Sequence, residues 1–83
     1  MGKVTPETFA YYLSDLGKLI REDALKAKKD RDMSKTKAEQ KFNEGRLMAY
    51  NEVISLMQQQ ANAFGLSFKE IALDGIDPDN DLV

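Results

Sequence analysis

The side chains that most often perform catalysis are missing from this sequence or stand alone in it. The 83 residues include no histidine and no cysteine, so the commonest general base and the thiol nucleophile are absent. The serines have no nucleophile motif around them: Ser14, Ser34, Ser55 and Ser67. The sequence contains no glycine-rich phosphate loop, and nothing in it sets two carboxylates in a shared pocket. We therefore predict that the protein is not an enzyme and that it binds no cofactor.

Three aspartates near the end of the sequence have the spacing of the first ligands of a calcium loop. They are Asp77, Asp79 and Asp81. Such a loop also needs a glycine at its sixth position, and the sixth position here is Leu82. We therefore predict that this stretch is a solvated acidic tail and holds no metal.

Basic residues gather in the middle of the sequence and acidic residues near its end. The stretch from Ala24 to Lys41 has seven basic and three acidic side chains, whereas from Leu66 onward five acidic side chains accompany one lysine. Six of these basic residues form a candidate basic tip: Lys26, Lys28, Lys29, Arg31, Lys35 and Lys37. Clustered cations are what contacts to phosphate require. However, acidic residues are interleaved with them and the net charge is −2, which favours a solvated tip over a nucleic-acid surface.

The elements that must carry these side chains are two long helices. Thr5 is a suitable N-cap and Pro6 suits the first helical position, so a helix is predicted over about 6–29. A tip follows over about 30–35, where apolar periodicity is absent. Thr36 and Glu39 resemble a capping box for a second helix over about 36–64, which Gly65 should end. The prediction continues with a short helix over about 68–73 and an acidic tail over about 74–83.

The second predicted helix carries more apolar surface than one neighbouring helix can cover. Its apolar side chains span about half of the helix circumference, wider than the usual stripe of about 100°. Six of them alternate steps of three and four, as in a coiled-coil seam: Leu47, Tyr50, Ile54, Met57, Ala61 and Phe64. We therefore predict that these six form an oligomer interface.

Polar residues interrupt the apolar stripes at a few positions. Folding the hairpin about its tip brings Asp23 on the first helix within about one turn of Arg46 on the second. These side chains are a possible register pair at the edge of the interface. The alternative is that both extend into solvent. Gly17 and Gly45 weaken their helices by about 1 kcal/mol each relative to alanine, and they either permit close helix approach or are simply tolerated.

These observations predict an all-α protein with a single domain over 1–83. Its fold is an antiparallel two-helix hairpin with a short C-terminal helix or tail, and we expect it to dimerise into a four-helix bundle. In an antiparallel dimer, the acidic tail of one copy would approach the basic tip of the other, and salt should weaken the dimer.

Three functions fit such a protein. The first is a non-catalytic protein–protein interaction module (a small regulator, adaptor or inhibitor) that acts as a homo-oligomer. The alternative is a nucleic-acid-associated regulator that uses the basic tip of a dimer, and the third is a purely structural subunit. No apolar run approaches the ~18 residues that a membrane-spanning helix needs. We therefore expect no membrane contact and a cytoplasmic location.

Overall fold

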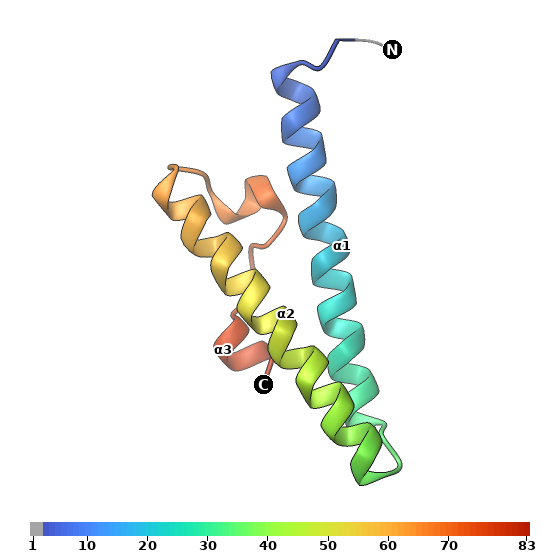
Figure 1. The fold of residues 1–83 in the computed structure, drawn as a ribbon. Coiled ribbons are helices and arrows are strands. Elements are labelled where there is room, and N and C mark those ends of the chain that lie inside the picture. Colours follow the sequence, from blue (N-terminus) through green and yellow to red (C-terminus); the bar gives the residue numbers. More distant parts are fainter. Residues whose placement is uncertain (1–2) are drawn as a thin grey trace.

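A computed structural model describes residues 3–83, and all regular structure within them is helical (Figure 1). Helix α1 spans Pro6–Asp32 and helix α2 spans Lys37–Ala63. A 3₁₀ turn, η1, follows at Phe68–Ile71, and a short helix, α3, at Pro78–Asp81. The all-helical class, the hairpin of two long helices and the short C-terminal helix are as predicted. Helix α1 is three residues longer than expected, and η1 is shorter than the helix predicted there.

Local side-chain hydrogen bonds fix where the long helices begin. The Thr5 hydroxyl accepts a hydrogen bond from the Thr8 amide at 3.3 Å, and the Thr8 hydroxyl accepts one from the Thr5 amide at 3.3 Å. Helix α2 begins where the Thr36 hydroxyl accepts a bond from the Glu39 amide at 3.1 Å. The predicted N-caps Thr5 and Thr36 are therefore confirmed.

Helix α2 ends at Ala63, and Gly65 follows its C-cap as the residue predicted to end the helix. Gly65 adopts a φ of 72°, a left-handed conformation that glycine takes with little strain. This reversal allows the amide of Leu66 to donate a hydrogen bond to the carbonyl of Ala61 at 2.8 Å. The chain then turns back along the hairpin.

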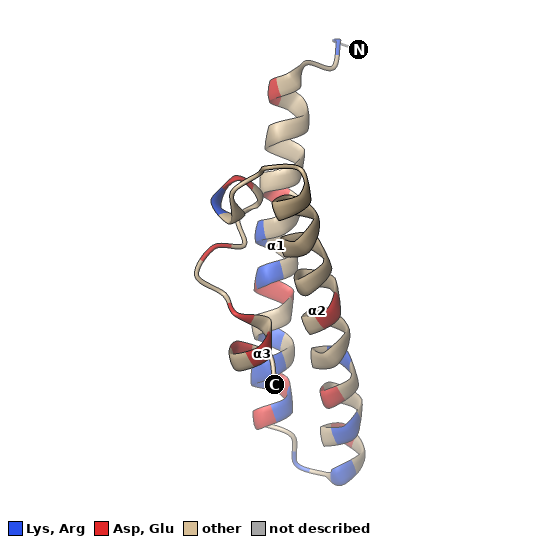
Figure 2. Cartoon of the chain, turned by 90° about the vertical axis from the view of Figure 1, so that its left-hand side faces the viewer, with Lys and Arg blue, Asp and Glu red and all other residues tan. Residues whose placement is uncertain are grey.

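Residues 66–82, here called the C-terminal segment, lie along one side of the hairpin (Figure 2). Leu73 and Leu82 are fully buried, and Ile76 is buried beside them. The prediction of a solvated tail from residue 74 onward is therefore wrong for these apolar side chains. They lie inside the protein, while most of the aspartates between them remain exposed.

The core lies where α1, α2 and the C-terminal segment meet. Its buried members come from all three: Ala24, Leu47, Ile54, Ala61, Ile71, Leu73, Ile76 and Leu82. The molecule measures 49 × 30 × 16 Å. A body only 16 Å thick has room for one layer of helices and one covering segment. The core is therefore confined to the side of the hairpin that the C-terminal segment covers.

Side chains of both long helices hold the backbone of the C-terminal segment. The Gln58 amide donates hydrogen bonds to the carbonyls of Leu73 at 3.1 Å and Ile76 at 2.9 Å. Four further bonds act in the same way: Asn51 to Pro78 at 2.7 Å and to Leu82 at 3.5 Å, Arg21 to Ala72 at 3.1 Å, and Lys28 to Asp81 at 2.7 Å. Apart from the Pro78 carbonyl, which also accepts from the Leu82 amide at 3.0 Å, these donors satisfy carbonyls that lack regular helical partners.

Candidate protein-interaction surface

The hairpin has an open end, opposite its tip, where α1 extends past the end of α2 (Figure 1). The first turns of α1 therefore have no neighbouring helix. Phe9 and Tyr12, both in this part of α1, are each 64% exposed. Aromatic side chains of this size usually account for much of the area buried in a protein core or interface.

Charged residues are missing from the open end of both long helices. None occurs from Thr8 through Ser14 on α1, and none from Val53 through Phe68 on α2 and the turn after it. Figure 2 shows the charged residues of the two helices concentrated toward the tip. The hairpin thus has a charged half and a nearly uncharged half, in which α1 carries Glu7, Asp15 and Lys18.

Large apolar side chains are exposed across this nearly uncharged half. We call them the open-end patch, and its members are Phe9, Tyr12, Leu13, Leu19, Val53, Leu56 and Phe64. Phe64, which follows the last turn of α2, is 77% exposed. A small protein that exposes a group of this kind usually uses it to bind a partner.

Most of the patch lies on the side of the hairpin that the C-terminal segment leaves uncovered. At about 100° per residue, Tyr12 lies half a turn around α1 from Arg21, which bonds the C-terminal segment. Leu56 lies close to half a turn around α2 from Gln58, which bonds the same segment. The uncovered side is therefore one continuous face formed by both helices.

A small apolar notch adjoins this face at the open end. Its volume is about 160 Å³, and Leu13, Met57, Gln60, Ala61, Phe64, Leu66 and Ile71 line it. It lies between the projecting part of α1 and the last turns of α2. Its walls are almost entirely hydrocarbon, so it suits an apolar side chain and offers no charged partner to a polar one.

The total accessible surface is larger than that of a compact monomer, as expected for a protein with an uncovered apolar face. The chain exposes 6219 Å², whereas a compact monomer of this size would expose about 5,000 Å². The difference is on the order of the ~800 Å² that each partner buries in a standard interface. Part of it reflects the elongated shape of the hairpin.

The six residues predicted as an oligomer interface divide between the core and the surface. Leu47, Ile54 and Ala61 are buried within the chain itself, so they cannot touch a second copy, and this part of the prediction is wrong. Tyr50 and Met57 are half-buried against the core. Only Phe64 belongs to the open-end patch. The alternating three- and four-residue spacing marks the internal face of α2, because this face packs against both α1 and the C-terminal segment.

Arg46 pairs with Asp30 and not with the predicted partner Asp23. The Arg46 guanidinium lies 3.0 Å from the Asp30 carboxylate, and it also donates to the Asn43 side chain at 3.0 Å. Asn43 in turn donates to the Ser34 hydroxyl at 3.0 Å. Asp30 lies about two turns nearer the tip than Asp23 on the same face of α1, and the Arg46 side chain leans toward the N-terminus of α2, which is at the tip. Asp23 remains exposed on the uncovered face.

The predicted basic tip is only partly available as a surface. Lys26, Lys29, Lys35 and Lys37 are exposed. Lys28 donates to the Asp81 carbonyl at 2.7 Å, and Arg31 pairs with Asp32 at 2.9 Å. Arg21 also lies 3.9 Å from Asp74. One acidic side chain of the C-terminal segment, Asp74, thus lies near a basic side chain of its own chain, and contact of this segment with the tip of another copy stays a prediction.

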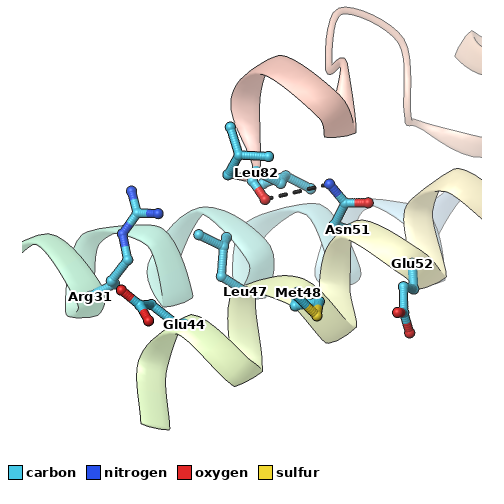
Figure 3. Close-up of a pocket in the computed structure, with 8 residues that line it drawn as sticks. Arg31, Glu44, Leu47, Met48, Asn51, Glu52 and Leu82 are labelled. Carbon is cyan, nitrogen blue, oxygen red and sulfur yellow. Dashed lines mark hydrogen bonds between the residues drawn. The ribbon is translucent and has the colours of Figure 1, made fainter. Parts of the chain in front are cut away.

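A second groove, of about 480 Å³, lies beside α3 (Figure 3). Leu47, Met48 and Leu82 form its apolar floor, and Arg31 and Glu44 lie at its rim. The Asn51 amide, which also lines it, is engaged with the carbonyls of Pro78 and Leu82. The groove therefore lacks a free set of converging polar groups of the kind that fixes a small ligand.

Titratable groups with a displaced pKa lie at helix starts. Hydrogen bonds from the backbone and from the Ser67 hydroxyl lower the pKa of Glu70 below its ordinary value. Hydrogen bonds from its own backbone and from Thr5 lower the pKa of Glu7 in the same way. Both shifts arise from capping geometry. Residues 3–83 contain no cluster of three or more acidic side chains placed to hold a metal ion, and none of the helices described is both long and apolar enough to cross a membrane.

No family model matches this chain, and comparison with curated proteins and with solved structures finds no significant similarity. The open-end patch is therefore assessed on its own geometry. The sequence analysis missed most of its members as interface residues. A signal for them is present in the sequence, because residues 53–68 form a long stretch without charge.

Proposed function

We propose that this chain is a non-catalytic protein–protein interaction module that acts in the cytoplasm as a homodimer, with the open-end patch as its contact surface. One observation carries the proposal. Exposed large apolar side chains and an absence of charge coincide at the same end of the hairpin. This coincidence is typical of the central part of an interface, where charged residues are depleted and aromatic ones enriched.

Physical considerations of size support self-association. A domain of about this length buries only roughly 60% of the surface that its unfolded chain exposes. Small domains usually add disulfides, metals or oligomerisation to compensate, and the sequence has no cysteine or histidine. Closed two-fold dimers are the commonest soluble oligomers.

The test is the mass of the protein in solution, measured by light scattering from micromolar to millimolar concentration. We expect a dimer, and we expect the substitution Leu56→Glu to convert it to a folded monomer by placing a charge in the patch. Met48→Glu is the matched control. Met48 is a similarly exposed apolar residue of α2, but it lines the groove beside α3 and lies outside the patch.

Two results would contradict the proposal. A folded monomer at every concentration would contradict the proposed homodimer. A dimer that survives Leu56→Glu and dissociates with Met48→Glu would show that association uses the side of α2 that borders the groove beside α3.

The alternative, a nucleic-acid-associated regulator, is supported by the exposure of Lys26, Lys29, Lys35 and Lys37 near the tip. It is weakened by the engagement of Lys28 and Arg31 within the chain. A mobility-shift assay with mixed-sequence duplex DNA and RNA separates the two functions. Binding that falls steeply with salt concentration would favour the alternative.

A further inference from the structure

Resting on the proposed self-association, we propose that two copies meet around a two-fold axis at their open ends. They overlap only along the uncharged parts of α1 and α2, so that the two tips point away from each other. The occupant of the open-end patch is thus the open-end patch of a second copy.

The open end of the molecule is self-complementary. The open end carries both a projecting apolar element, the first turns of α1, and an apolar notch lined by Leu13, Met57 and Phe64. A two-fold axis at this end places the projecting turns of each copy against the notch and neighbouring α2 face of the other. Such a contact closes on itself and does not propagate into a filament.

The distribution of charge along the uncovered face also favours open-end overlap. Toward the tip, this face carries Asp23 and the Asp30–Arg46 pair. Full-length overlap of two antiparallel hairpins would press these groups against the open-end patch of the other copy. Burying an unpaired carboxylate against hydrocarbon is strongly unfavourable. Overlap of the open ends alone leaves all three side chains in water.

The area that the contact can bury also supports this arrangement. Phe9, Tyr12 and Phe64 are each at least 64% exposed, and an aromatic side chain can bury about 150–250 Å². The exposed leucines and the helix surface between them add further apolar area to these three side chains. Together these areas approach the ~800 Å² per partner of a standard interface.

Distances between matching labels test the arrangement directly. Because the chain contains no cysteine, a single introduced cysteine accepts one spin label. We choose Tyr11→Cys, on the side of α1 away from Phe9, and Lys35→Cys in the tip. From a rise of about 1.5 Å per residue, open-end overlap predicts about 20–30 Å between Tyr11 labels and about 55–65 Å between Lys35 labels in the dimer. Full antiparallel overlap places the axis near residue 20 and predicts about 30 Å between Tyr11 labels and about 45 Å between Lys35 labels, and a parallel dimer predicts two short distances.

A matched pair of phenylalanine variants provides a second measurement. Phe9 and Phe42 are 64% and 69% exposed, but Phe42 lies in the charged half near the tip. We expect Phe9→Ser to raise the dimer dissociation constant by about tenfold or more and Phe42→Ser to leave it within about threefold. In the full-overlap arrangement Phe42 is covered, so both variants would weaken the dimer.

These measurements distinguish open-end overlap from self-association itself. A short Tyr11 distance with a long Lys35 distance supports open-end overlap. A dimer whose Lys35 distance is about 45 Å or shorter, or one weakened by Phe42→Ser as much as by Phe9→Ser, overturns the arrangement and leaves self-association standing. A monomer at all concentrations overturns both.

Discussion

At the scale of single residues, Gly17 determines how closely the C-terminal segment approaches α1. A Cβ built at position 17 would overlap the carbonyl oxygen of Ile71 and lie 2.9 Å from its carbonyl carbon. Both are backbone atoms of η1, so neither can move away without displacing the turn. Gly17 is accordingly buried in the middle of a helix where alanine would otherwise be preferred.

We expect Gly17→Ala to lower the free energy of unfolding by about 2 kcal/mol, because the strain of overpacking exceeds the gain of about 1 kcal/mol in helix propensity. Urea unfolding at a fixed protein concentration, followed by circular dichroism, measures the change. Fixed concentration matters because the proposed dimerisation would contribute to the apparent stability.

The control for this substitution is Gly45→Ala. Gly45 is also inside a long helix, but a Cβ there would meet nothing within 4 Å. We expect this variant to gain up to about 1 kcal/mol. Equal effects at the two positions would show that η1 does not pack against Gly17 as the structure has it.

The sequence leaves open whether either of these glycines permits close approach or is simply tolerated. Both occur inside amphipathic helices, where close approach by a second helix is the expected reason for a glycine. The neighbour of Gly17 is instead a 3₁₀ turn more than fifty positions later in the chain. Local periodicity contains no information about such a contact.

At the scale of elements, the C-terminal segment is the part of the fold that the sequence describes least well. The caps and the apolar periodicity predict the two long helices. In the C-terminal segment, by contrast, Leu73, Ile76 and Leu82 follow no helical or strand period, and the aspartates between them are typical of a solvated tail. The segment is ordered by donors on α2, chiefly Gln58 and Asn51, whose role depends on the tertiary fold.

We expect Gln58→Ala to loosen the C-terminal segment and to lower the free energy of unfolding by about 1–3 kcal/mol. The reason is that Gln58 donates to two backbone carbonyls, Leu73 and Ile76, and each lost hydrogen bond costs about 0.5–1.5 kcal/mol. Hydrogen exchange should increase for the amides of residues 71–82 and remain slow in the tip half of α2.

Gln59→Ala is the neighbouring control for this effect. The Gln59 side chain is exposed, so its removal should change stability by no more than about 0.5 kcal/mol. If both variants leave exchange in the C-terminal segment unchanged, Gln58 does not hold that segment in place.

At the scale of the whole molecule, the separation of charge along the hairpin determines which forces can join two copies. The tip half is rich in charges of both signs, and the open half has almost none on its helices (Figure 2). The sequence analysis expected an acidic tail to reach the basic tip of another copy. The structure instead directs Lys28 and Arg21 to the C-terminal segment of the same chain. The proposed contact between copies is accordingly assigned to the apolar open-end patch.

We consequently expect salt to leave the dimer intact, in contrast to the behaviour of a dimer held by ion pairs. Raising the ionic strength from about 0.05 M to about 0.5 M shortens the Debye length severalfold and weakens exposed ion pairs. Burial of hydrocarbon is insensitive to this screening, and a kosmotropic salt such as sulfate strengthens it. Sedimentation equilibrium should therefore give a dissociation constant that is unchanged within about threefold in sodium chloride and lower in sodium sulfate. A dissociation constant that rises tenfold or more in sodium chloride would mean that the charged half of the hairpin carries the contact, and the open-end patch would then be free for a different partner.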